Sequence, residues 1–129
     1  MKNFEFIDIT TADVAFVAYG KDINELYANA ALAMFEVMVN TSKVEKKVEE
    51  KIHVEGYDLE SLMFNWLNEL LCISDSKNLA FSEFDVKIDL LNFKLEAICK
   101  GEEIVQEKHE TKTVVKAATY HQMKIWKED

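Results

Sequence analysis

Residues 23–38, INELYANAALAMFEVM, decide the fold expected of this chain. Their apolar side chains recur at positions i, i+3, i+4 and i+7, which is the spacing of one buried face of a helix. Asp22 is placed to cap this helix, and Glu25, three residues later, completes a capping-box pattern. A stripe this regular is typical of core packing. The pattern therefore predicts an amphipathic helix that covers a hydrophobic core.

The segments on either side of this helix have the pattern of strands. Residues 4–8 (FEFID) and 14–19 (VAFVAY) predict two short strands, with residues 10–13 as the turn between them. After the helix, residues 43–55 place apolar side chains on even positions among many charges. This period of two predicts a strand with a solvated outer face. The charges suit the edge of a sheet, where they discourage aggregation.

A second helix is expected after Gly56. Asp58 can cap it, and an apolar stripe at helical spacing runs from Leu59 to Leu71. Residues 74–78 (SDSKN) are small or polar, which predicts the loop that leaves this helix.

Three further strand-like segments complete the chain, at residues 84–90, 93–100 and 113–126. The resulting order is two strands, a helix, a strand, a helix and three strands, which is neither regular βαβ alternation nor an all-β pattern. It predicts an α+β fold in which two helices pack on a mostly antiparallel sheet. The 129 residues include no proline and only three glycines, and no segment has the composition of a linker. We therefore expect a single domain over residues 1–129.

The charge balance limits the possible partners. The chain has 24 acidic and 15 basic residues, and its formal net charge is −9. Nucleic-acid-binding proteins usually carry a positive surface, because neutralising phosphates releases counterions. We therefore expect no direct nucleic-acid binding. An acidic surface suits a basic protein partner, or a divalent cation where carboxylates converge.

The sequence has no signature of membrane insertion or of catalysis. No apolar run approaches the roughly 20 residues that span a bilayer, and the N-terminus lacks the pattern of a signal peptide. A cytoplasmic location without membrane association is therefore expected. No GxSxG, HExxH or glycine-rich phosphate loop is present, and we expect no enzyme. Cys72 and Cys99 are expected to be buried thiols, and His53 and His109 to be solvated.

The turn at residues 10–13 (TTAD) holds the first candidate for a functional site. Small hydroxyl side chains beside a carboxylate can hold a turn by hydrogen bonds to the backbone. Alternatively, Asp13 can be a ligand of Ca²⁺ or Mg²⁺ if other oxygens converge on it. The residues alone leave both interpretations open.

The last predicted strand holds the second candidate. Period two places Lys116 and Tyr120 on one face and His121 on the other, more apolar face. A lone histidine on an apolar face is usually a hydrogen-bonded core residue. Lys116 is less expected on a mainly apolar strand, because a lysine that faces a core needs a partner. That partner could be a structural carboxylate, a phosphate or an acidic group of another protein.

Four segments of this sequence resemble the archease family, in the order in which the family has them. They are the turn at residues 10–13 (HTAD in most archeases), the helix segment 23–38, the segment 62–71 (LMFNWLNELL), and the pattern GE…KH…VKAxTYH, present at Gly101-Glu102, Lys108-His109 and 116–121. Together they cover nearly the whole chain.

The resemblance implies a cytosolic, non-catalytic accessory protein of the tRNA-splicing RNA ligase. Archeases promote guanylylation of the ligase and its multiple turnover, and they have chaperone-like character. The family also binds a divalent metal, Ca²⁺, near the turn aspartate, and Asp13 is the matching position here. Lys116, Tyr120 and His121 belong to the matching C-terminal pattern and are candidates for partner binding.

The sequence departs from the family pattern at two places. Thr10 stands where most archeases have a histidine. Archeases also continue through one more apolar strand that ends in Asp and an aliphatic residue, and these residues join the metal site. This sequence ends at residues 126–129 (WKED), and Asp129 lacks the apolar strand before it. The expected metal site is therefore incomplete, unless the sequence is a shortened form or another chain supplies the oxygens.

Two other classes of function remain open. A metal-dependent hydrolase could use Asp13 with His121 and Lys116, which would require these groups to meet in one pocket. A general chaperone-like or small-ligand-binding domain would be favoured by a lasting exposed apolar patch.

Overall fold

A computed structural model describes residues 4–9 and 14–109 of the chain. The strands are β1 (Phe4–Ile9), β2 (Val14–Ala18), β3 (Val48–Glu55), β4 (Leu79–Asp89) and β5 (Lys94–Glu103). The helices are α1 (Ile23–Met38), the short 3₁₀ helix η1 (Thr41–Lys43), α2 (Leu59–Lys77) and the single turn α3 (Gln106–His109).

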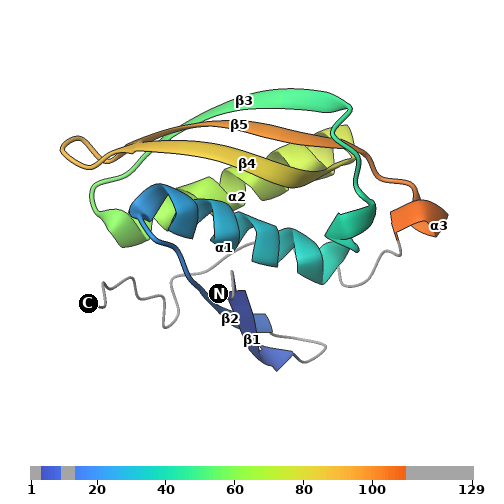
Figure 1. Ribbon diagram of the computed structural model, residues 1–129. Helices are drawn as coiled ribbons and strands as arrows, with labels where there is room; N and C mark the ends of the chain where they lie inside the picture. Colours follow the sequence, from blue (N-terminus) through green and yellow to red (C-terminus); the bar gives the residue numbers. More distant parts are fainter. Residues whose placement is uncertain (1–3, 10–13, 110–129) are drawn as a thin grey trace.

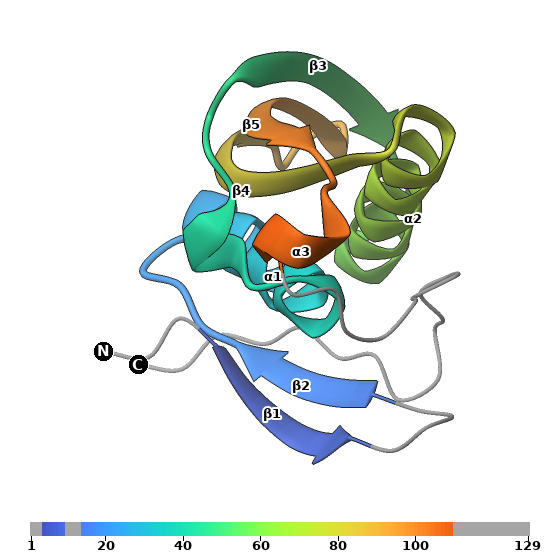
Figure 2. The same cartoon turned by 90° about the vertical axis from the view of Figure 1, so that its right-hand side faces the viewer.

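The described strands form two antiparallel sheets. β3, β5 and β4 pair in that order, and β1 pairs with β2. Helices α1 and α2 cover one face of the three-stranded sheet, and the β1–β2 sheet lies on the opposite side of α1 (Figures 1 and 2). The predicted α+β fold, with two long helices on an antiparallel sheet, is confirmed. No helix in the described part of the chain combines the length and the apolar character needed to cross a membrane.

Helix α1 begins where the sequence predicts, although the cap is formed differently. The Asp22 carboxylate accepts the backbone N–H of Glu25 at 2.8 Å, so Asp22 is the N-cap. The Glu25 carboxylate, however, accepts from the backbone N–H of Lys21 at 3.2 Å rather than from Asp22. The reciprocal capping box is therefore not formed. Phe35 of α1 packs edge-on against Phe81 of β4, with ring centroids 5.7 Å apart, and this contact joins the helix to the sheet.

Helix α2 has the predicted start and a later end. Asp58 caps it, and the Ser61 side chain completes a capping box with Asp58. The predicted exit loop at residues 74–78 is wrong, because the helix continues to Lys77. Asn78 ends it in the left-handed conformation (φ 55°), and its N–H donates to the carbonyl of Ser74.

Strand β3 is shorter than predicted. It begins at Val48 rather than at residue 43, because the preceding residues use their backbone groups elsewhere. Residues 41–43 form η1, whose cap is the Asn40 side chain, and the backbone N–H of Glu45 donates to the Glu102 side chain. Among the strands that the structure describes, β3 lies at an edge of its sheet, as predicted. Two strands are longer than predicted at the open end of their hairpin. β4 begins at Leu79 rather than at residue 84, and β5 ends at Glu103 rather than at residue 100.

The outer face of the three-stranded sheet is charged and solvated. On the central strand, the Nζ atom of Lys100 lies 3.6 Å from a carboxylate oxygen of Glu49 on β3 and 3.5 Å from one of Glu83 on β4. His53 of β3 is exposed, as expected, and its Nε2 lies 3.0 Å from Glu55. This face therefore has its charges matched across the strands, and the core lies on the helix side.

The two cysteines differ in environment. Cys99 of β5 is buried in the core, as expected. Cys72 of α2 is exposed, so the expectation of two buried thiols is wrong for this residue. The buried stripe of α2 includes Leu70, Leu71 and Ser74, and the rotation of 100° per residue turns position 72 away from it.

Candidate functional site

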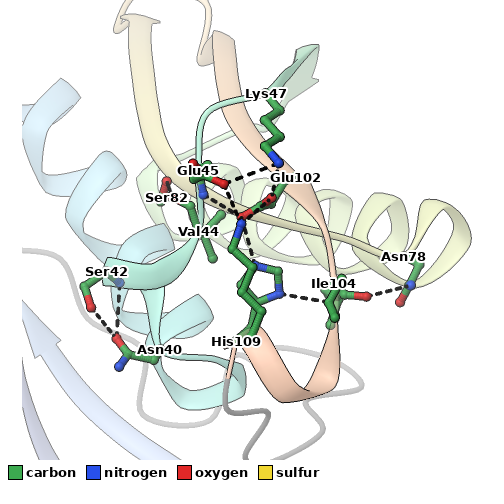
Figure 3. Close-up of polar contacts among 12 residues, drawn as sticks. Asn40, Ser42, Val44, Glu45, Lys47, Asn78, Ser82, Glu102, Ile104 and His109 are labelled. Atoms are coloured by element: carbon green, nitrogen blue, oxygen red, sulfur yellow. Dashed lines mark hydrogen bonds and ion pairs between the residues drawn. The ribbon is translucent and has the colours of Figure 1, made fainter.

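A cluster of five charged or polar side chains lies at the base of the β4–β5 hairpin, and we call it the Glu102 cluster (Figure 3). Its members are Glu45 and Lys47 from the segment before β3, Glu102 from β5, and Lys108 and His109 from α3. Glu102 and His109 are buried, with relative exposures of 6% and 0%. Buried charged groups are rare unless they are paired, so this cluster is the polar feature of the described chain that most needs an explanation.

The hydrogen bonds of His109 define its tautomer. The backbone N–H of Val105 donates to Nδ1 of His109 at 2.9 Å, so Nδ1 carries no proton. The proton of the neutral ring is therefore on Nε2, which donates to Oε2 of Glu102 at 2.9 Å. Both ring nitrogens are occupied in a fully buried side chain. The expectation that His109 lies solvated in a polar loop is wrong.

Glu102 is held in its charged form. Burial by itself would raise the pKa of Glu102, but hydrogen bonds from the backbone N–H of Glu45, from His109 and from Lys108 outweigh burial and lower this pKa to about 2. The Nζ atom of Lys108 lies 2.9 Å from Oε2 of Glu102, and the N–H of Glu45 lies 2.7 Å from the same atom. The ammonium of Lys47 is 3.5 Å from Oε1. One buried carboxylate on β5 thus gathers donors from two other segments of the chain, the stretch before β3 and α3.

The backbones of β4 and β5 approach each other closely beside the Glu102 cluster. A Cβ atom added to Gly101 would lie 1.8 Å from the carbonyl oxygen of Ala80 and 2.7 Å from Cα of Phe81, at a point where the β4–β5 register shifts. Only glycine allows the two strands to approach this closely. The carbonyl of Gly101 also accepts from the N–H of Lys47 at 2.9 Å, and the carbonyl of His109 accepts from the N–H of Asn40 at 2.8 Å.

The chemistry open to this cluster is positioning rather than catalysis. A general base needs a free lone pair that a substrate proton can reach, and His109 has neither a free nitrogen nor an exposed ring. The cluster ties the end of β5 and the turn α3 to the segment before β3. The sequence signal for it was the GE…KH part of the family pattern. That signal did not reveal that Glu102 and His109 are partners.

The candidate residues named from the sequence lie outside the described residues. Asp13, Lys116, Tyr120 and His121 all belong to residues 10–13 or 110–129. The distance between Asp13 and His121, on which the hydrolase hypothesis depends, is therefore not tested. Within residues 4–9 and 14–109, no group of three or more His, Cys, Asp or Glu side chains could hold a metal ion.

The fold and the Glu102 cluster together define a small α+β protein in which a buried carboxylate orders the end of the central strand. Residues 4–129 match the archease protein family (MTH1598/TM1083). The chain belongs to the archease family, and this membership supports the role of an accessory protein.

Relatives from archaea match this chain over nearly all of its length. It is 50% identical over 125 residues to protein archease of Sulfurisphaera tokodaii, which covers 97% of this chain and 89% of the relative. It is also 50% identical over 129 residues to protein archease of Sulfolobus acidocaldarius, covering 100% of this chain and 92% of the relative. The solution structure of protein 1598 of Methanobacterium thermoautotrophicum has the same fold, with a TM-score of 0.85 and 49% identity over 100% of this chain and 92% of that one.

Proposed function

We propose that this chain is a non-catalytic accessory protein that activates the tRNA-splicing RNA ligase, promoting its guanylylation and multiple turnover with a chaperone-like mode of action. The observation that carries this proposal is family membership over residues 4–129. The role places the protein in the cytosol, where it would contact the ligase and not the RNA. The molecule that it binds would therefore be a protein.

The charge of the chain and the chemistry of the Glu102 cluster support this role. A net charge of −9 suits contact with an enzyme that carries the positive surface needed for RNA. The buried histidine of the cluster has both nitrogens occupied, which fits a protein that positions segments and does not itself transfer protons.

We further propose that Asp13 is a ligand of a divalent metal, by resemblance Ca²⁺. Carboxylate oxygens are the ligands that Ca²⁺ prefers, and its affinity is tuned by the number of charged ligands. A site at Asp13 would need further oxygens, from this chain or from the ligase. Lys116, Tyr120 and His121 are proposed to contact the partner.

A reconstituted ligase assay tests the proposal. The cognate RNA ligase is held at limiting concentration, and both guanylylated ligase and joined RNA are measured with and without this protein. We expect more guanylylated enzyme and more than one joined product per ligase. If neither quantity rises, the proposed function is wrong.

Substitution at the turn aspartate tests the metal role in the same assay. Asp13→Ala is expected to abolish the stimulation and to remove binding of Ca²⁺ measured by calorimetry. Asp75→Ala, an exposed aspartate on α2, is the matched control and should change neither. Full stimulation by the Asp13→Ala protein would show that Asp13 is a turn residue only.

The described surface does not favour the small-ligand alternative. Ligand pockets are usually concave and mostly apolar. Two depressions of the described surface, of about 360 and 400 Å³, lie at the junction of β3 with α2 and on the charged outer face of the sheet. Most of their lining side chains are polar or charged: Glu55, Asn65, Asn68 and Glu69 in one, and Lys51, His53, Asp85, Lys87 and Glu96 in the other.

A further inference from the structure

Three of the large apolar side chains that the described surface exposes lie at one end of the molecule, and we call them the tip. Leu91 is 91% exposed, Tyr57 78% and Leu90 52%. Leu90 and Leu91 lie in the β4–β5 turn, and Tyr57 lies in the connection from β3 to α2 (Figure 1). Single exposed apolar residues are ordinary, but a cluster of them at one place marks an interaction surface.

Hydrogen bonds order the turn of the tip and join it to the β3–α2 connection. The Asp89 carboxylate accepts the N–H groups of Leu91 at 3.0 Å and Asn92 at 3.3 Å, and it also accepts from the Asn92 side chain at 2.9 Å. These bonds lower the pKa of Asp89 from its ordinary value. The carbonyl of Phe93 accepts the N–H of Gly56 at 2.9 Å, which joins the turn to the connection that carries Tyr57.

The last residue of this turn has a left-handed backbone conformation. Phe93 has φ of 49°, in the left-handed region that side chains with a Cβ disfavour. Hairpin loops built on a type I turn often end in a residue of this conformation, so Phe93 serves to close the β4–β5 hairpin. Apolar side chains on a short hydrogen-bonded turn suit an interface, because ordering them on binding costs little conformational entropy.

The charges around the tip select the kind of partner. The two connections, residues 55–60 and 89–94, carry four acidic residues and one basic residue: Glu55, Asp58, Glu60 and Asp89 against Lys94. A second copy of this chain would bring the same acidic rim against its own, and an anionic membrane would repel it. A basic protein surface complements it.

We propose that Tyr57, Leu90 and Leu91 form a docking surface for a basic protein that presents an apolar pocket with a positively charged rim. This inference rests on the proposed function, which makes the RNA ligase that partner. The leucines would fill the pocket, and the acidic rim would supply orientation and a fast association rate.

Binding of the full-length protein to its cognate RNA ligase, measured without RNA by biolayer interferometry, tests the surface. The double variant Leu90→Ser/Leu91→Ser is expected to weaken binding at least about tenfold, because serine gives up the favourable transfer of two leucine side chains from water into an apolar pocket. Val48→Ser is the matched control, since Val48 is an exposed apolar residue (39%) at the other end of β3. It should stay within about twofold of wild type.

Two variants that each remove one negative charge from β3 test the acidic rim. Glu55→Gln should weaken binding a few-fold at low salt and much less at high salt, because exposed charges are screened. Glu49→Gln lies on the same strand and is equally exposed, but it is distant from the tip, and it should have no effect.

The outcomes separate this inference from the proposed function. Wild-type binding that the double variant leaves unchanged overturns the docking surface and leaves the proposed function standing. Wild type that neither binds nor stimulates the ligase overturns both. A wild-type dimer in sedimentation velocity that the double variant dissociates overturns the choice of partner. Circular dichroism should show the same melting temperature for all variants; if the double variant melts earlier, Leu91→Gln alone decides, because Leu91 is almost fully solvated.

Discussion

The Nε2 atom of His109 lies 2.9 Å from the Oε2 atom of Glu102, and both side chains are buried although they stand on either side of an irregular segment. The pair closes the segment between β5 and α3 into a fixed turn. Because burying the Glu102 carboxylate costs solvation free energy, the hydrogen bonds that it accepts offset that cost, whereas removal of one partner leaves the buried charge less well compensated. The main role of the pair is therefore to fix the conformation of the chain where it leaves the central strand β5.

Glu102→Gln removes the charge that the cluster is built around. The amide offers a single acceptor oxygen to donors from Glu45, Lys108 and His109, so some of them lose their partner inside the protein. We expect the free energy of unfolding to fall by about 1–3 kcal/mol in urea denaturation. Glu103→Gln, at the exposed next position of β5, is the control and should stay within about 0.5 kcal/mol of wild type. Equal losses for both variants would contradict a special role of Glu102.

The lowered pKa of Glu102 predicts a dependence of stability on pH. In the unfolded chain this carboxyl has an ordinary pKa near 4.5, and in the folded protein it is about 2. The unfolded state therefore takes up the proton first, so the stabilisation is complete above pH 4.5 and is lost as the pH falls toward 2. It amounts to about 3 kcal/mol. Unfolding midpoints measured from pH 6 to pH 2.5 should fall more steeply for wild type than for Glu102→Gln; parallel curves would refute the assignment.

Gly101→Ala tests the close approach of β4 and β5. The added methyl group would meet the carbonyl of Ala80, which belongs to the backbone and cannot rotate away. Overpacking of this kind costs about 1–3 kcal/mol, so thermal melts should show a clear loss of stability. Glu103→Ala adds no atom at such a contact and serves as the comparison. A Gly101→Ala protein as stable as wild type would mean that the two strands can separate at low cost.

The thiols should differ in reactivity. Burial raises the pKa of Cys99 to about 12, with a smaller contribution from the charge of Glu50, so almost no thiolate forms at neutral pH. Cys72 is exposed on α2. Titration of the native protein with a disulfide reagent should modify one thiol per chain, and Cys72→Ser should reduce this number to zero. Two thiols that react at equal rates would show that Cys99 is accessible.

Local patterns in the sequence were sufficient for most of the fold. The helical period of apolar residues located both long helices, and Asp22 and Asp58 located their starts, because helix geometry and capping depend on residues only three or four apart. The edge position of β3 among the described strands also followed from its charges. The strand boundaries were less accurate, since the extent of a strand depends on the strand it pairs with.

The contacts of the Glu102 cluster could not be predicted from local sequence patterns. The family pattern marked Gly101, Glu102, Lys108 and His109 as a group, but their roles depend on Glu45 and Lys47, more than 50 residues earlier in the chain. His109 has polar neighbours in sequence and is nonetheless fully buried. Burial is a property of packing, so no local rule could distinguish His109 from the exposed His53.

The amino-acid order alone was enough to establish the two amphipathic helices, the α+β class and the resemblance to archeases, because periodicity, capping and motif order are properties of neighbouring residues. Only the tertiary structure decided that Glu102 and His109 pair in the interior and that Tyr57 joins Leu90 and Leu91 at one end of the molecule. These contacts form when segments distant in sequence meet, and the free energy that brings them together comes from burial of the common core.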